Sequence, residues 1–165
     1  LSNLFDAEVI TTVGSEQKKQ YVKDLGASKA INYKTEDFVE LVKDKGVDVI
    51  LDSIGGNYFA KHMGVLNPDG RLIQINASTG AQVNLDIIQL MQKRILLTGS
   101  TLRARDRIFK SELRSAIEKS VIPYICSGKL KPVVTKSFAL SEVSLAHDFF
   151  DREDFYGKIV LTMRC

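Results

Sequence analysis

The sequence has no tryptophan, two cysteines and no long hydrophobic run. Cys126 and Cys165 lie far apart without C-x-x-C spacing, which argues against a disulfide scaffold and a structural zinc site and favours a reducing compartment. No stretch approaches the roughly 18 apolar residues of a membrane span, and the first residues do not form a signal peptide. We therefore expect a cytoplasmic protein with no membrane partner.

An excess of charge of one sign is also missing. The 23 Lys and Arg residues face 20 Asp and Glu residues, and the basic ones are scattered rather than gathered in blocks. This balance gives no support for a nucleic-acid partner. The two histidines, His62 and His147, lack a Cys or Glu at metal-ligand spacing, so we expect surface or half-buried side chains and no metal site.

Motifs that carry their own nucleophile are absent too. The sequence contains no G-x-S-x-G elbow and no Ser/His/Asp constellation. Ser111 and Ser141 are interpreted as helix starts. We assign no catalytic residue, because in such an enzyme a cofactor would carry the reaction and the protein would supply position and electrostatics.

What the sequence does contain is an alternation of short strands and helices. Residues 6–26 open it with a β-branched strand at 8–13, a turn at Gly14, and a helix that Ser15 caps and Gly26 ends. Further strands are predicted at residues 30–33, 47–52, 71–75, 95–98, 133–138 and 158–162. Further helices are predicted at residues 35–45, 57–66, 84–93 and 110–126 and after Ser141, with Thr35, Asn84 and Ser141 as caps and a bend or early end at Pro123. The alternation predicts an α/β fold with a mostly parallel, doubly wound sheet.

The glycine-rich turn of a dinucleotide-binding sheet is missing. Such a sheet opens with a strand, a G-x-G-x-x-G turn and a helix, and its strands run in the order 3-2-1-4-5-6. If residues 8–13 form the second strand, the first one and its turn lie upstream of Leu1. Without that strand, a gap of ~9–10 Å would separate the second and fourth strands and leave an unpaired edge on each. We expect an incomplete Rossmann-type sheet in residues 1–127 and a different lobe in residues 128–165.

The end of the first strand indicates the type of cofactor. NAD enzymes place an acid there for the ribose 2′-hydroxyl, whereas NADP enzymes need a cation and hydrogen-bond donors. Here Ser15 is followed by Lys18, with no acid before Glu16. A 2′-phosphate would be bound by Ser15, the helix N-terminus and Lys18, with Tyr33 on the adenine side. In the alternative interpretation Ser15 is only a cap and Lys18 is part of a solvated helix face, and spacing alone leaves both open.

Three small polar loops follow strands at the same edge of the predicted sheet. They occupy residues 52–55, 76–80 and 100–103. Because open α/β sheets bind ligands at the carboxyl ends of their strands, these loops predict a crevice. Ser53 is placed to donate to a ribose, although a plain turn explains it equally well. The arginines of the third loop and its continuation are more simply interpreted as solvated than as phosphate ligands.

Together these residues resemble the zinc-independent quinone oxidoreductases of the medium-chain dehydrogenase/reductase superfamily, and most of all the p53-inducible quinone oxidoreductases and their bacterial relatives. Each matching segment is weak alone, but they occur in order, at family-like spacing, over nearly the whole chain. The segments are Val13-Gly-Ser-Glu-Gln-Lys18, Leu25-Gly-Ala27, Ile31-Asn-Tyr-Lys34, Val49-Ile-Leu-Asp-Ser-Ile-Gly-Gly56, Asp69-Gly-Arg71, Gly99-Ser-Thr-Leu-Arg-Ala-Arg105 and Gly157-Lys-Ile-Val-Leu161.

The resemblance implies reduction of a quinone or enone by hydride transfer from NADPH. By position, Ser15, Lys18 and Tyr33 would face the adenosine 2′-phosphate. The remaining cofactor contacts would be Ser53 at the ribose, Ile75 and Ser78 near the phosphate–nicotinamide half, and Thr101 and Leu102 at the nicotinamide.

The resemblance also implies a two-lobed subunit and a homodimer. Residues 128–165 would complete the catalytic, GroES-like lobe, and residues 95–100 would pair with a second copy. The N-terminal lobe, first cofactor strand and glycine-rich turn of that family have no counterpart in this sequence. We therefore expect the isolated chain to be inactive and to bind NADPH weakly or not at all.

Three other interpretations stay open. A zinc-type alcohol dehydrogenase or an enoyl reductase has a similar cofactor half. The fold of an S-adenosylmethionine methyltransferase would explain residues 47–52 and the turn at 67–70. Such enzymes carry an acid at the end of the second strand to bind the ribose hydroxyls, and residues 13–15 supply none. A non-enzymatic α/β module would bind a partner through its open sheet edges.

Overall fold

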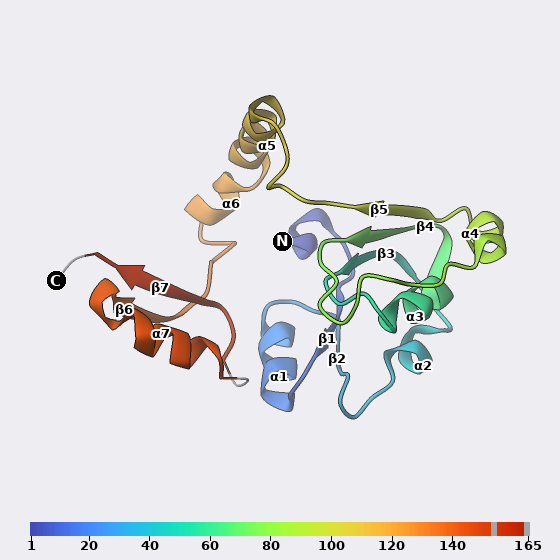
Figure 1. Ribbon diagram of the computed structural model, residues 1–165, viewed down its shortest axis with the longest axis horizontal. Coiled ribbons are helices and arrows are strands. Elements are labelled where there is room, and N and C mark those ends of the chain that lie inside the picture. Colours follow the sequence, from blue (N-terminus) through green and yellow to red (C-terminus); the bar gives the residue numbers. More distant parts are fainter. Residues whose placement is uncertain (153–154, 164–165) are drawn as a thin grey trace. The chain divides into compact units, whose positions relative to one another are not determined.

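The computed structural model describes residues 1–152 and 155–163 (Figure 1). Cys165 lies outside the described residues. The chain forms two compact units, one of residues 6–110 with Ser2 and one of the residues from 111 onward with Leu1 and residues 3–5. In the described part of the chain, every helix is too short or too polar to span a bilayer. The assignment of residues 128–165 to a catalytic lobe stays a prediction.

Parallel strands joined by helices build the unit of residues 6–110. After the 3-10 helix η1 (Ser2–Phe5), the elements are β1 (Ile10–Val13), α1 (Glu16–Asp24), β2 (Lys29–Asn32), α2 (Phe38–Val42), β3 (Val47–Asp52), α3 (Tyr58–Val65), β4 (Leu66–Gln74), α4 (Ile87–Lys93) and β5 (Leu96–Gly99). Every described strand pair in this unit is parallel. The predicted α/β class with a parallel sheet is therefore confirmed.

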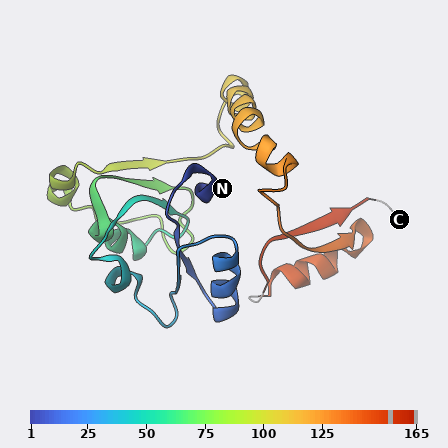
Figure 2. The ribbon, with the colours of Figure 1, turned by 180° about the vertical axis from the view of Figure 1, so that it is seen from behind.

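The sheet of this unit is split in two. β1 pairs with β2, while β3, β4 and β5 form a separate sheet in that order. Helix α1 lies against the β1–β2 pair (Figure 2). An order of 3-2-1-4-5-6 would need one more strand between β1 and β3. The break thus falls where the sequence analysis predicts the gap.

The face of the three-stranded sheet that α3 covers carries the main core. Leu72, in the central strand β4, is 0% exposed. It belongs to a cluster with Phe59, Met63, Leu66 and Ile95. Side chains alternate along a strand, so Val49 and Leu51 of β3 point to the opposite face, where they are 48% and 66% exposed. Helix packing on the three-stranded sheet is thus one-sided.

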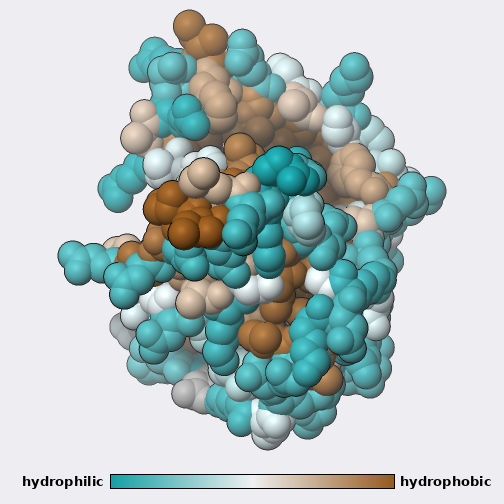
Figure 3. All heavy atoms as spheres, turned by 90° about the vertical axis from the view of Figure 1, so that its right-hand side faces the viewer, coloured by the Kyte–Doolittle hydropathy of each residue, from teal (hydrophilic) through white to brown (hydrophobic). Residues whose placement is uncertain are grey.

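A second cluster ties the two sheets of this unit together through α2. Ile31 of β2 is 1% exposed and packs with Phe38 and Val42 of α2 and with Val65 of α3. Helix α4, by contrast, turns Ile87, Ile88 and Met91 outward, each more than half exposed. Figure 3, which looks onto the side that carries α4, shows hydrophobic residues gathered at the surface.

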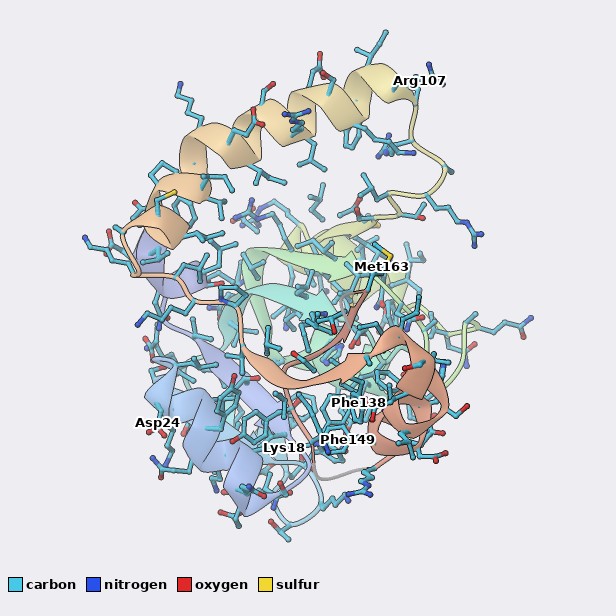
Figure 4. The ribbon with its side chains drawn as sticks, turned by 90° about the vertical axis from the view of Figure 1, so that its left-hand side faces the viewer. Lys18, Asp24, Arg107, Phe138, Phe149 and Met163 are labelled. Atoms are coloured by element: carbon cyan, nitrogen blue, oxygen red, sulfur yellow. The ribbon has the colours of Figure 1, made fainter. Side chains whose placement is uncertain are left out.

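The second unit contains one parallel strand pair with an aromatic core. Its elements are most of α5 (Arg107–Ser120), then α6 (Ile122–Cys126), β6 (Val134–Ala139), the 3-10 helix η2 (Leu140–Glu142), α7 (Val143–Phe150) and β7 (Lys158–Thr162). The ring centroids of Phe138 and Phe149 lie 5.9 Å apart. Figure 4 labels both side chains. Lys136 Nζ is 4.9 Å from both ring centroids, a cation–π geometry that ties β6 to α7.

Two helix starts differ from the prediction. Asp37 caps α2 in place of Thr35, and its carboxylate accepts the Val39 N–H at 3.0 Å. Asp86 caps α4 in place of Asn84 by accepting the Gln89 N–H at 3.1 Å. Asn, Asp, Ser and Thr all fit a helix start, so the choice between neighbouring candidates depends on which side chain reaches a free N–H in the folded chain.

The limits of three further elements also differ from the predicted ones. Ser141 is not a cap, because η2 precedes α7 and the Glu142 carboxylate accepts the Ala139 N–H at 3.0 Å. β4 starts at Leu66, so the predicted turn at 67–70 lies within its bounds, as an irregularity where the pairing with β3 passes from Leu66 to Arg71 and Asp69 has a φ of 63°. The predicted helix over 110–126 is divided at Val121 into α5 and α6, with Pro123 in the first turn of α6. The break expected from Pro123 is confirmed, since proline fits the start of a helix and not its interior.

Leu72→Ala should destabilise the fold by about 2–5 kcal/mol, because it removes a fully buried side chain and leaves a cavity in the core. Leu51→Ala is the matched control, since Leu51 belongs to the same sheet but points to its exposed face. Its cost should stay within about 0.5 kcal/mol. Urea unfolding followed by circular dichroism measures both, and equal losses would contradict the assignment of the core to the α3 face.

Candidate functional site

The carboxyl end of β1 brings together three residues predicted to face the adenosine. Ser15 is the N-cap of α1, and its Oγ accepts the Lys18 N–H at 3.2 Å. Tyr33 follows β2, and its N–H donates to Val13 O at 3.0 Å. A Cβ on Gly14 would lie 2.8 Å from Tyr33 Oη, so glycine lets the tyrosine lie directly on this turn. Lys18 is one turn into α1 (Figure 4).

The acids near this end are engaged with other groups. Glu36 accepts from Lys19 Nζ at 2.6 Å and from the Asn32 N–H at 2.8 Å, and these contacts, Lys19 first, lower the pKa of Glu36. Glu16 accepts from Asn32 Nδ2 at 2.9 Å, and its carboxylate is 3.9 Å from Lys19 Nζ. The carboxylate charge beside the β1 turn is thus partly offset by Lys19.

The loops after β3 and β4 are joined by backbone hydrogen bonds. The Gly56 N–H donates to Gly80 O at 3.0 Å, the Thr79 N–H to Ile54 O at 2.9 Å, and the Ser78 N–H to Ser53 O at 3.4 Å. The predicted ribose residue Ser53 and the predicted phosphate-side residue Ser78 therefore lie on adjacent loops.

A pocket with a volume of about 730 Å³ lies at the carboxyl ends of β4 and β5. This volume is in the range of small-molecule sites. Most of its lining residues are small: Gly55, Phe59, Gln74, Asn76, Ala77, Gly80, Ala81, Val83, Leu97, Gly99, Ser100, Thr101, Ala104 and Arg105. Of the predicted cofactor residues only Thr101 lines it. Ile75 and Leu102 are next to lining residues but are themselves 47% and 53% exposed.

A buried carboxylate lies behind this pocket, and sequence reasoning missed its partners. Asp52, at the end of β3, is 2% exposed. His62 of α3 was expected at the surface or half buried, but it is 8% exposed and its Nδ1 lies 3.2 Å from Asp52 Oδ2. An acid ending an otherwise apolar strand was the available signal. No sequence pattern placed the histidine, because its position depends on how α3 packs on the sheet.

The environment shifts the pKa of both groups. Burial lowers the pKa of His62 by disfavouring the cation, and Asp52 only partly opposes this. Burial alone would raise the pKa of Asp52. The N–H groups of Ile54 and Gly55, the Gln74 amide and His62 outweigh it, so the pKa of Asp52 is lowered.

Within residues 1–152 and 155–163, no three His, Cys, Asp or Glu side chains gather as ligands of a metal ion would.

The sequence profile of the zinc-binding dehydrogenase family matches residues 25–161. The chain belongs to this family. Among the curated relatives, the 2-haloacrylate reductase of a Burkholderia species is 32% identical over 163 residues, which cover 94% of this chain and 48% of the relative. Quinone oxidoreductase 1 of Escherichia coli is 29% identical over 161 residues, covering 94% and 49%. The chain thus spans about half the length of the curated relatives it matches.

Solved structures with similar names also match the fold of this chain. The crystal structure of E. coli quinone oxidoreductase complexed with NADPH matches with a TM-score of 0.77 at 28% identity, over 94% of this chain and 49% of that one. The crystal structure of a 2-haloacrylate reductase matches with a TM-score of 0.80 at 30% identity, over 96% and 51%. The predicted resemblance to quinone oxidoreductases of the medium-chain superfamily and the Rossmann-type fold are confirmed. Zinc independence stays a prediction.

His62 should make the fold less stable as the pH falls. Its folded pKa lies below the ordinary 6.5, so the unfolded state takes up the proton first and stability is lost progressively below about pH 6.5. Above that pH the contribution is fully present. In His62→Phe the loss of stability that His62 causes at low pH should be absent, because phenylalanine takes up no proton. Its ring can still pack beside Phe38 and Tyr58, as the imidazole does. The urea midpoints of the wild type and of His62→Phe at pH 7.5 and 5.5 measure this loss of stability. An equal drop in midpoint between the two pH values for both proteins would contradict the prediction.

Proposed function

We propose that the chain supplies the greater part of the cofactor surface of an NADPH-dependent oxidoreductase that transfers a hydride to a quinone or an enone. The observation that carries this proposal is the end of β1, where Ser15, Lys18 and Tyr33 are held together and no acid ends the strand. The chain's family and its similarity to quinone oxidoreductases support the same class of reaction.

At the β1 end, the residues present fit an adenosine 2′-phosphate. The first turn of α1 directs backbone N–H groups and the positive end of the helix dipole out of the strand end. Ser15 Oγ adds a hydroxyl, and the Lys18 ammonium adds the cation that distinguishes a 2′-phosphate from a 2′-hydroxyl. Tyr33, 45% exposed against Gly14, would cover one side of the adenine.

At the other end, the loops after β3, β4 and β5 would hold the nicotinamide half. Ser53 would donate to the ribose, Ile75 and Ser78 would flank the phosphate–nicotinamide half, and Thr101 and Leu102 would border the nicotinamide. Glycines at the pocket wall would let a ligand approach the backbone closely. When bound, NADPH would supply the hydride, and the chain would contribute orientation and the exclusion of water.

The substrate we propose is an electron-poor conjugated compound. The relatives' names, quinone oxidoreductase and 2-haloacrylate reductase, both describe proteins acting on a C=C or C=O system conjugated to an electron-withdrawing group. Such a system accepts a hydride at carbon, the displaced electron pair moves to oxygen, and a proton from solvent completes the reduction. The pocket at the strand ends, where the nicotinamide half would lie, is lined mostly by small residues, which would leave room for a flat compound of either kind beside the nicotinamide.

The quaternary proposal is a homodimer through residues 95–100. β5 ends its sheet, and Leu96 and Leu97 are 55% and 38% exposed. Pairing with a second copy would cover this apolar edge and satisfy its backbone groups. Residues 128–165 would complete the catalytic lobe of the whole protein, and the isolated chain would be inactive.

NADPH should shift the backbone amide signals of Ser15, Lys18 and Tyr33 in an NMR titration of the labelled chain, with affinity weaker than micromolar. NADH should shift them less at the same concentration, because it lacks the 2′-phosphate. Lys18→Ala should weaken NADPH binding about tenfold and leave NADH unchanged, as expected for one charge-assisted hydrogen bond.

Lys43→Ala is the matched control, since Lys43 pairs with Glu40 on α2. It should leave both titrations unchanged. Equal responses to NADPH and NADH would argue against the assignment of the β1 end, and micromolar affinity would contradict the expectation for the isolated chain.

A further inference from the structure

We infer that Asp52 is a positioning residue, whose carboxylate fixes the two joined loops that form one wall of the pocket. This role rests on the proposed function only in so far as the pocket holds the nicotinamide half of the cofactor. The hydrogen bonds themselves are a property of the chain alone.

The side chain of Asp52 accepts hydrogen bonds from the turn that follows its own strand and from the neighbouring strand β4. Oδ1 accepts the Ile54 N–H at 2.7 Å, and both oxygens lie 3.3 Å from the Gly55 nitrogen. Oδ2 accepts from Gln74 Nε2, at the end of β4, at 2.8 Å. A carboxylate this deeply buried is tolerated only where donors replace its water. Asp52 therefore joins the turn after β3 to the neighbouring strand.

The turn that Asp52 holds is in direct backbone contact with the loop after β4. Gly55 has a φ of +69°, and a Cβ there would lie 2.7 Å from Gly80 O. The Gly56 N–H donates to the same carbonyl at 3.0 Å. A displacement of the turn would therefore move residues 77–80, and Ala77 and Gly80 line the pocket together with Gly55.

The atoms left without partners show which substitution should be tolerated. In the described structure, Gln74 Oε1 is buried without a hydrogen bond, and His62 Nδ1 makes no well-formed one. Asparagine at position 52 keeps one oxygen for the turn amides. Its Nδ2 would donate to Oε1 of a flipped Gln74, which leaves Nε2 rather than Oε1 at the position without a partner, so Asn keeps the link to β4, whereas Ala removes it. The role in positioning thus depends on hydrogen bonds rather than on charge.

The test compares Asp52→Ala and Asp52→Asn in the labelled full chain. In Asp52→Ala, amide exchange at Ile54 and Gly55 should accelerate at least about tenfold, because hydrogen bonds to a buried carboxylate are lost. NADPH-induced shifts at Ser53 and Ser78 should fall about threefold or more, while those at Ser15 stay unchanged. Asp52→Asn should resemble the wild type in both measurements.

Asp69→Asn is the matched control, because Asp69 pairs with Arg94 in an exposed site early in β4. It should change neither the exchange at Ile54 and Gly55 nor the NADPH shifts at Ser53. A folded Asp52→Ala with wild-type exchange would overturn the proposal, and so would an Asp52→Asn that behaves like Asp52→Ala.

Two further outcomes are separable. If Asp52→Ala does not fold, Gln74→Met removes the hydrogen bond from β4 to Asp52 and also, because Gln74 lines the pocket, one polar group of the pocket wall. The deciding measurement in that variant is amide exchange at Ile54 and Gly55, which should accelerate, and unchanged exchange would overturn the role of Asp52. If NADPH shifts no residue of the wild type, the proposed function fails, and the exchange rates at Ile54 and Gly55 alone then decide the positioning role.

Discussion

Parallel pairing is the constraint on which the rest of this structure depends. Each helical crossover returns the chain to the same end of its sheet, so β1 and β2 finish at one edge of their sheet, and β3, β4 and β5 finish at one edge of theirs. The turn after Asp52 and the loops that follow β4 and β5 are thereby gathered at one edge of the three-stranded sheet without being near one another in sequence. A crevice at this edge results from the topology, and the side chains at the strand ends determine its chemistry.

Much of this architecture could be predicted because its signals are local. β-branched runs marked the strands, and Ser15 and Gly26 marked the limits of α1. The order of the elements could be read in the same way, and so could the place of the gap in the sheet. Competition between neighbouring caps was harder to predict, since Thr35 and Asp37 both fit a helix start and only the folded geometry shows which one reaches a free N–H.

The candidate site was predictable in its position but not in its internal contacts. Ser53 and Ser78 were placed on the correct edge, yet the hydrogen bond between their backbones depends on the register of β3 and β4. The link from Asp52 to His62 was missed for a related reason. It crosses from a strand to the helix that covers it, and no periodicity in the sequence reports the rotation of that helix.

The split sheet divides the site as well as the fold. Ser15, Lys18 and Tyr33 belong to the β1–β2 sheet, whereas the pocket belongs to the β3–β4–β5 sheet. A dinucleotide is long enough to contact both half-sites at once. Binding at one half-site raises the affinity at the other only if the distance between the two is fixed. A strand inserted between β1 and β3 would fix that distance through hydrogen bonds on both sides, about 4.8 Å to each neighbour. In this structure the two sheets are joined through α2, where Ile31 of β2 packs with Phe38, Val42 and Val65, so the separation of the two half-sites depends on side-chain packing rather than on a shared ladder of hydrogen bonds. Preference for NADPH would therefore persist at the β1 end even when overall affinity is low, because in the proposed site the 2′-phosphate would contact residues beside the β1–β2 sheet alone.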